Sequence, residues 1–470
     1  MTLAFILYLI TVLALGLFSA YYTKSDDDFL LAGRKLGPIS ASLSAAATSM
    51  SGWLLLGLPG EIFRLGLSAA WVGVGCIIGD YANWRFVARR LHDRTLKLNA
   101  VTLSEFLSNQ EKTPAARLVR LVSGLSVVFF MTLYLWAQFV ATGKALSASF
   151  AGIFNYEMSV LCGALVIIAY TACGGLISVV LTDVLQASLM FLTLVGLPVY
   201  SLWLVISNGQ LETIMNTPAP SSASHMITDL WGGNTGLAIV LLLVSNLGIG
   251  AAYIGQPQIS SRFMAIQNSN EIPIARRIGV GWVTVTCIGV TILSLCAHTI
   301  LPAPPHDSEE VILDMASYLL PNWLAGIVIA AVMAAIMSSA DSFLITAVAS
   351  IQKDFVSGFS SLKVSRSFTL FLGIIATALA ITTDPSDPNT TVFQLVGYAW
   401  GGLAIAFGVP MLYSLFNSEP NTKIILMTML VGLVAMALWH VLGLSNYVYE
   451  VIPCMTIQTF FCLSILFFNR

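Results

Sequence analysis

Residues 52–64 read GWLLLGLPGEIFR, and residues 250–262 read GAAYIGQPQISSR. Both stretches follow the pattern G-x4-G-x-P-x4-R within otherwise apolar sequence. Glycine and proline interrupt the hydrogen bonds of a helical backbone, and in a lipid bilayer such backbone persists only where protein buries it or where it lines a cavity. The two stretches therefore predict two broken helices at matched positions of the chain.

The composition of the whole chain indicates a membrane protein. Hydrophobic residues make up 57% of the 470 residues and charged residues only 9%, whereas soluble domains average about 25% charged residues. A globular core of this size has no way to hide so much apolar surface. The composition excludes a soluble enzyme, a disordered chain and a secreted disulfide scaffold, and a formal net charge of −2 leaves no basic surface for nucleic acid.

Hydropathy predicts how often the chain crosses the bilayer, since a helix needs about 20 mostly apolar residues to span it. No positively charged n-region precedes the first apolar window, so we interpret it as a membrane helix and not as a signal peptide. Thirteen windows qualify as spans: 3–22, 38–60, 66–86, 121–146, 158–178, 185–207, 235–257, 278–301, 321–346, 367–383, 391–416, 424–443 and 448–468.

The distribution of lysine and arginine predicts the orientation of these spans. With the N-terminus outside, 19 of the 21 basic residues fall in cytoplasmic segments, and only Arg64 and Lys144 do not. The long outer loops, 208–230 and 302–318, contain no lysine or arginine. The positive-inside rule therefore predicts an N-out, C-in, all-α integral membrane protein.

Each patterned stretch opens a set of five predicted spans, the second to sixth and the seventh to eleventh. Because five is odd, the two sets have opposite orientations, so Arg64 falls outside and Arg262 inside. Inverted repeats that begin with broken helices are typical of secondary transporters, and the alternative is two ordinary kinked helices packed through glycines. We predict one transport domain and no enzymatic activity. Its expected parts are 38–207 (first repeat), 235–416 (second repeat) and 424–468 (two C-terminal helices), within a single domain over 1–470.

Polar side chains beside the first break indicate where an ion or a solute binds. Thr48, Ser49 and Ser51 precede the break, and their hydroxyls either line a site or bond back to their own helix. Most aromatic residues in such a chain pack or form interfacial belts. Three of them gain interest because they lie at or near the predicted breaks: Trp53, Tyr134 and Tyr253.

The ninth predicted span carries an unusual run of oxygen-bearing side chains, Ser338, Ser339, Asp341 and Ser342. For the serines the alternative is close packing of small residues at a helix interface, but this explains Asp341 poorly, since a buried carboxylate needs a partner or an ion. Asp183, at the expected start of the sixth span, is either a helix N-cap or part of a cation site. The seven cysteines form no CxxC or Cys/His cluster, so neither a transition-metal site nor a disulfide framework is expected.

Five segments of the chain carry a family resemblance. They are LAGRKLGP (31–38), ATSMSGWLLLGLPG (47–60), LTDVLQASLM (181–190), AYIGQPQISSRFMAIQ (252–267) and VGYAWGGLAIAFG (396–408). Together they resemble the sodium/solute symporters, and within them the sodium/proline symporters, over essentially the whole chain. The resemblance implies a sodium-coupled importer of a small solute, with L-proline the first expectation, that works by alternating access in a plasma membrane, the inner membrane of a bacterium. Its partners would be sodium, the solute and the lipid bilayer, with no cofactor and no nucleic acid.

The resemblance also implies which residues bind the ions. A sodium site between the second and ninth spans would use the carbonyl oxygens of Ala47, Met50 and Ala335 and the hydroxyls of Ser338 and Ser339. A second cation site, found in some members, matches Asp183, Asp341 and Ser342.

The solute site implied by the resemblance lies at the helix breaks, and an arginine of the first inner loop, Arg34, matches one that matters for coupling. The expected solute-binding residues are Ser49, Ser51, Gly52, Trp53, Tyr134, Tyr253 and Pro257.

Two positions depart from the sodium/proline symporters that the chain resembles. Those relatives carry an Asp directly before the Met of the MSGW motif, where this chain has Ser49, and a Trp where this chain has Ile249. The first change removes a charge from beside the sodium site, and the second removes an aromatic wall of the solute pocket. Two alternatives therefore stay open: the same fold carrying another amino acid or a carboxylate, and a transporter-like membrane sensor.

Overall fold

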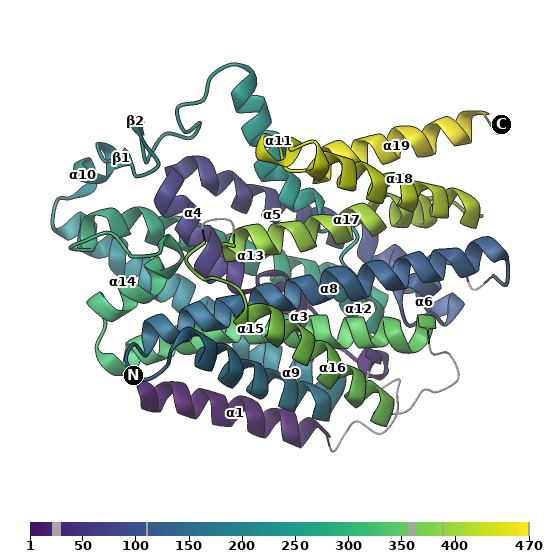
Figure 1. The fold of residues 1–470 in the computed structure, drawn as a ribbon, viewed down its shortest axis with the longest axis horizontal. Coiled ribbons are helices and arrows are strands. Elements are labelled where there is room, and N and C mark those ends of the chain that lie inside the picture. Colours follow the sequence, from purple (N-terminus) through teal and green to yellow (C-terminus); the bar gives the residue numbers. More distant parts are fainter. Residues whose placement is uncertain (21–29, 110, 356–361, 388–389, 469–470) are drawn as a thin grey trace.

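Helices make up nearly all of the computed structural model, which describes residues 1–20, 30–109, 111–355, 362–387 and 390–468 (Figure 1). Nine helices within these residues are long and apolar enough to cross a membrane, and shorter apolar helices cover 2–16, 156–172 and 237–251. Residues 21 and 22, the end of the first predicted window, lie outside the described residues. Helices dominate because a backbone in lipid must satisfy its own hydrogen bonds.

The first half of the chain contains two broken or kinked membrane segments and one long unbroken helix. Its elements are α1 (Thr2–Ala20), η1 (Ala32–Arg34), α3 (Pro38–Ser49), η2 (Trp53–Gly57), α4 (Leu58–Leu65), η3 (Gly66–Ala70), α5 (Trp71–Ala82), η4 (Asn83–Ala88), α6 (Arg89–Leu98), α7 (Leu103–Leu107), α8 (Pro114–Ser149), α9 (Tyr156–Ser207) and α10 (Leu211–Met215).

The second half begins with a short hairpin and continues with helices. Its elements are β1 (Pro218–Ala219), β2 (Ser222–Met226), α11 (Leu237–Ala251), α12 (Pro257–Ala265), η5 (Ser269–Glu271), α13 (Ile272–Ile300), η6 (Ser308–Glu310), α14 (Val311–Leu319), α15 (Asn322–Ser350), η7 (Ile351–Phe355), α16 (Leu362–Ile381), α17 (Val392–Phe416), α18 (Thr422–Val441), η8 (Leu444–Asn446) and α19 (Val451–Phe468).

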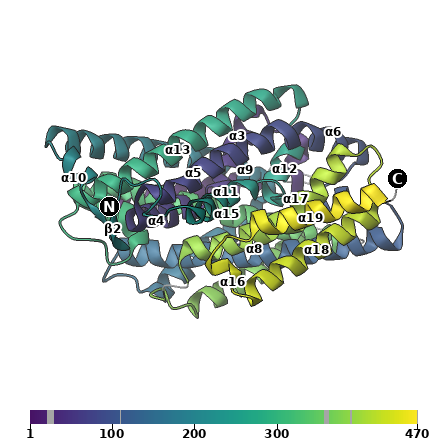
Figure 2. The ribbon, with the colours of Figure 1, turned by 90° about the horizontal axis from the view of Figure 1, so that it is seen from above.

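Helix α15 forms the centre of the bundle. It packs against α8, α9, α1 and α3, and 83% of its most apolar window is buried, against 22% for α19. The helices run roughly along one direction, with the two chain ends at opposite ends of the bundle (Figure 1). Helices α18 and α19 pack together along one edge (Figure 2). The site described below lies against the buried helix.

The two helix breaks predicted from sequence are present. Helix α3 ends at Ser49 and the helix resumes at Trp53, while α11 ends at Ala251 and α12 begins at Pro257. The second break contains Gly255 at φ +109°, where a Cβ would lie 2.7 Å from the backbone nitrogen of Gly408. Only glycine fits this turn without strain.

Glycines also let α5 and α11 touch through their backbones. A Cβ added at Gly79 would collide with the carbonyl of Gly250, and a Cβ added at Gly250 would collide with the carbonyl of Gly75. Small residues at such a crossing permit close helix packing in a bilayer. The first helix of the second predicted repeat is thus fixed directly against the first half of the chain.

Three local expectations differ from the structure. The helix of the third span continues through η4 and α6 to Leu98, beyond the window that ends at residue 86. Residues 179–184, expected as a connection, are helical, because α9 is interrupted only at Gly175 (φ 61°, ψ −157°). Residues 208–230, expected as an outer loop, contain an antiparallel hairpin, β1 with β2, in a fold expected to be all-α.

Candidate functional site

The first helix break exposes backbone groups in the middle of the protein. Met50, at φ −100° and ψ 56°, ends α3. The free N–H of Gly52 donates to Oε1 of Gln138 on α8 at 3.1 Å. A Cβ at Gly52 would lie 2.9 Å from the side chain of Ile336, so the glycine lets α15 approach the break closely.

Two hydroxyls of α15 meet the free carbonyls at the end of α3. Ser338 Oγ donates to Ala47 O at 3.2 Å, and Ser339 Oγ lies 3.1 Å from Thr48 O. Both hydroxyls also lie 3.1–3.2 Å from Ala335 O within α15. These groups are fully buried and offer only oxygen atoms, which are the ligands that a hard cation prefers.

The structure thus brings together four of the five residues expected to bind sodium, Ala47, Ala335, Ser338 and Ser339. Met50, the fifth, lies fully buried at the end of α3.

The hydroxyls near the first break show both arrangements that the sequence leaves open: one bonds back to its own helix, and the others contact neighbouring helices. Ser49 Oγ bonds back to Ala46 O of its own helix at 3.0 Å. Thr48 Oγ1 instead lies 3.0 Å from Ser342 Oγ on α15. Ser51 Oγ lies 3.3 Å from the hydroxyl of Tyr134 on α8. Thr48 and Ser51 therefore connect the broken helix to its neighbours, whereas the Ser49 hydroxyl forms a hydrogen bond within its own helix.

Aromatic rings enclose the space beside the first break. Trp53 Nε1 donates to Ser49 O at 3.1 Å. The ring of Trp400 stands edge-on to Tyr253, at 5.1 Å and 82°, and to Tyr134, at 6.2 Å and 85°. Tyr134 and Tyr253 are fully buried. Most of the residues expected to bind solute, from three distant parts of the chain, therefore gather around one aromatic cluster.

The space at this aromatic cluster is small in the structure. A cavity of about 20 Å³ is lined by Trp53, Ile249, Phe393, Val396, Gly397 and Trp400, which is room for about one water molecule. Pro257 lies elsewhere, at the start of α12, and lines a separate cavity of about 30 Å³ with Val127, Ile345 and Met264. A solute at this cluster would require the rings to move, because the cavity there is only about 20 Å³.

A second buried polar cluster lies beside the first, where α3, α9, α12 and α15 meet. Arg262 of α12 is fully buried and forms an ion pair with Asp183 Oδ2 at 3.4 Å. Its Nη2 donates to Ser342 Oγ at 2.6 Å and its Nε to Ser44 Oγ at 3.0 Å. Ser44 in turn donates to Asp183 at 2.6 Å. On the other side, Asp341 accepts a hydrogen bond from Tyr170 at 2.8 Å.

This cluster corrects one expectation. Asp183 is not a helix N-cap, because α9 continues on both sides of it and restarts earlier, at Gly175. Arg262, expected in a cytoplasmic segment, is fully buried against α3, α9 and α15. Asp183, Asp341 and Ser342 do come together, as the second expected cation site requires.

The comparisons with known proteins decide the family. A family profile described as the sodium:solute symporter family matches residues 29–432. The chain belongs to the sodium:solute symporter family. A sodium/proline symporter of Haemophilus influenzae is 35% identical to it over 467 residues, covering 96% of this chain and 90% of the relative. OpuE, an osmoregulated proline transporter of Bacillus subtilis, is 33% identical over 462 residues, covering 95% and 90%.

Solved structures share the fold of this symporter. A Na⁺-coupled sialic acid symporter in a substrate-bound, outward-open state has a TM-score of 0.73 at 18% identity, covering 97% of this chain and 96% of the other. MhsT in complex with L-phenylalanine has a TM-score of 0.58 at 15% identity, covering 87% and 98%. The chain is thus a multi-pass membrane transporter and not an enzyme, and sodium is its coupling ion rather than a bound cofactor.

Arg34, in the segment between α1 and α3, contacts two distant parts of the symporter. It lies in η1, and its guanidinium donates to Met264 O at 3.2 Å and to Ala100 O at 2.6 Å. Leu36 adds a backbone bond to Ala265 O at 3.0 Å. Arg34 therefore fastens the segment before α3 to the end of α12.

An ion cluster near η6 explains why Lys144 departs from the charge rule. Lys144 Nζ lies 2.8 Å from both Asp307 Oδ2 and Glu309 Oε2. Glu309 also accepts the backbone N–H groups of Val392 and Phe393 at the start of α17. Burial raises the pKa of Glu309, although the Lys144 ammonium opposes the shift. The cluster holds η6 against α8 and α17.

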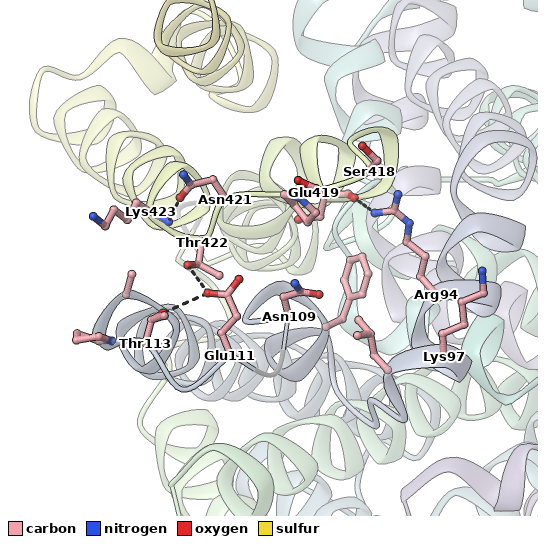
Figure 3. A pocket seen from close by; sticks show the side chains of 16 residues that line it. Arg94, Lys97, Asn109, Glu111, Thr113, Ser418, Glu419, Asn421, Thr422 and Lys423 are labelled. Carbon is pink, nitrogen blue, oxygen red and sulfur yellow. Dashed lines mark hydrogen bonds between the residues drawn. The ribbon is translucent and has the colours of Figure 1, made fainter. Parts of the chain in front are cut away.

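A larger cavity of about 960 Å³ lies apart from these sites, among α6, α7, α8, α17 and α18 (Figure 3). Arg94 faces it and donates to Asn417 O at 2.7 Å and to Ser414 O. Glu111 accepts a hydrogen bond from Thr422 at 3.1 Å across it. The lining residues in the described part of the symporter include none of the predicted site residues.

Sequence reasoning missed several residues of the symporter's site. Gln138, in an apolar window, caps the first break, and Gln256 Nε2 donates to Ala252 O and Trp400 O across the second. An amide side chain inside a predicted span is a signal that could have identified both. Trp400 and Tyr170 offered no such signal, since their neighbours come from distant parts of the chain.

Proposed function

We propose that this symporter imports L-proline together with sodium. Relatives named as proline transporters, at 32–35% identity over most of the chain, support this substrate. The observation that carries the coupling mechanism is the pair of bonds from Ser338 and Ser339 to the carbonyls of Ala47 and Thr48. A sodium ion at this seam would tie the broken α3 to α15, so its binding favours one arrangement of the two helices over another.

In this proposal, sodium binds to the carbonyls of Ala47, Met50 and Ala335 and to the two serine hydroxyls of α15. The direct contacts between α3 and α15 would open slightly to admit the ion. The solute binds beside it, at the aromatic cluster of Trp53, Tyr134 and Tyr253, with Ser49, Ser51, Gly52 and Pro257 as the remaining proposed contacts. Movement of the rings would enlarge the small cavity that Ile249 now lines.

We further propose the topology expected from sequence: thirteen spans, N-out and C-in, with inverted repeats over 38–207 and 235–416 and a single domain over 1–470. Helix breaks at matched positions and chain ends at opposite ends of the bundle support it. The membrane would be the inner membrane of a bacterium. Asp183, Asp341 and Ser342 form the second cation site of the proposal, and Arg34 couples the inner loop to α12.

Uptake by purified protein tests the proposal. Proteoliposomes with an inward sodium gradient should accumulate radiolabelled L-proline above the outside concentration, and replacing sodium with choline should abolish the accumulation. Empty liposomes made from the same lipids are the control.

The alternatives predict different results in the same assay. If another amino acid or a carboxylate is accumulated and L-proline neither accumulates nor competes, the fold carries a different solute. If sodium drives no uptake of any solute while ligand binding persists, the chain is a sensor and the transport proposal is wrong.

A further inference from the structure

Arg262 and the proposed second cation site compete for the same atoms. The side chain is 0% exposed, and its guanidinium contacts Asp183 Oδ2, Ser342 Oγ and Ser44 Oγ. An anionic pocket of carboxylate and hydroxyl oxygens is the kind of site that a small hard cation would take. In the structure that pocket already contains a positive charge, supplied by the chain itself.

The charge of Arg262 lies inside the protein, beside two buried carboxyl groups. Asp183 is fully buried and its other carboxylate oxygen, Oδ1, makes no hydrogen bond to any residue that the structure describes. Asp341 is held separately, by the hydroxyls of Tyr170 at 2.8 Å and Ser342 at 3.2 Å. Removing the guanidinium would leave two buried carboxyl groups around Ser342 with no cation, which is strongly unfavourable.

The pocket connects directly to the proposed sodium site. Ser342 Oγ, which accepts from Arg262, lies 3.0 Å from Thr48 Oγ1. The carbonyl of Thr48 accepts from Ser339 at 3.1 Å. A continuous series of buried oxygen atoms therefore leads from the sodium site to Arg262. Arg262 itself is carried by α12, the short helix that begins just after the second break.

We propose that Arg262 is a tethered cation that replaces a second sodium ion. With its guanidinium in the Asp183–Ser342 pocket, the symporter binds one sodium ion, and loss of the guanidinium turns the pocket into a second sodium site. The inference rests on the proposed sodium coupling. It makes Arg262 the residue that sets the number of ions bound with each solute.

Equilibrium binding of radioactive sodium to purified protein, at saturating L-proline, tests the inference. Wild-type protein and Arg262→Lys should bind one ion, and Arg262→Gln should bind two. The double variant Asp183→Asn/Arg262→Gln removes the opposite charges together and should bind one. Arg64→Gln is the matched control, because Arg64 holds the equivalent position of the sequence pattern but is half exposed and paired with Glu61; it should bind one ion.

Two sodium ions on the wild-type protein would overturn the inference, as would one ion on folded Arg262→Gln that still binds L-proline. If Arg262→Gln does not fold, the wild-type count decides alone. A different result would show that the proposed function itself is wrong: adding sodium would then leave the binding of L-proline to the wild-type protein unchanged.

Discussion

Removing both hydroxyls of the α3–α15 seam should abolish sodium coupling. In Ser338→Ala/Ser339→Ala, the ion would keep only carbonyl ligands. A hydrogen-bond-like contact to a charged group contributes about 1.5–3 kcal/mol, and each 1.4 kcal/mol is about tenfold in affinity. Because neighbouring ligands are not additive, we expect a loss of at least about 100-fold in sodium affinity for the double variant.

The same substitutions should leave the fold intact. Each serine also bonds back to Ala335 O within its own helix, and alanine is the better helix former. Ser294→Ala is the control, since Ser294 is equally buried and bonds back to Val290 O, but lies on α13 away from the seam. Calorimetric titration with sodium gives the affinities. An affinity of the double variant within twofold of the control would refute the assignment of the sodium site.

Three further predictions concern the proposed solute pocket, the position of Ser49 and the partly buried carboxyl group of Glu310. Trp53→Ala and Tyr253→Ala should each weaken L-proline binding more than sodium binding in calorimetry, because both rings enclose the proposed pocket; unchanged solute affinity in both would move the pocket elsewhere. Ser49→Asp should tighten sodium binding by roughly 1–2 kcal/mol when the carboxylate is ionised near the ion, with the gain fading as pH falls, whereas Ser49→Asn should give none. Burial, together with the negative charges of Asp307 and Asp314, raises the pKa of Glu310 from 4.5 to about 7. The folded state therefore binds this proton more tightly than the unfolded state, and the free energy of unfolding should fall as pH rises through about 7. Melting temperatures between pH 5 and 8 should show this slope in the wild type and a flatter one in Glu310→Gln.

The architecture followed from the sequence wherever a local rule applies. Apolar windows predicted the long helices, and Gly255 with Pro257 predicted the second break. Both predictions succeed because hydropathy and backbone freedom depend only on neighbouring residues. The first break falls at Met50–Gly52, slightly before the Gly57–Pro59 pair, where the π-helical turn η2 runs directly into α4 and Gly57 keeps helical φ and ψ angles.

The pairing of distant polar residues was less predictable. The run from Ser338 to Ser342 predicted a binding site on α15, but nothing local identified Arg262 as the partner of Asp183. The charge rule counts charges near span ends and takes no account of burial, so it gave no sign that Arg262 is buried inside the protein. Helix α9 likewise kinks at Gly175 and continues through Asp183. Composition alone could not distinguish this continuous helix from a new helix that starts at Asp183.

The Arg262–Asp183 pair also has a consequence for biosynthesis. The two residues are 79 positions apart in the chain, and ribosomes add about 5–20 residues per second, so Asp183 exists for roughly 4–16 seconds before its partner is made. A carboxylate alone in hydrocarbon is too costly to persist. Until α12 has been synthesised, Asp183 must therefore either stay in contact with water or carry a proton.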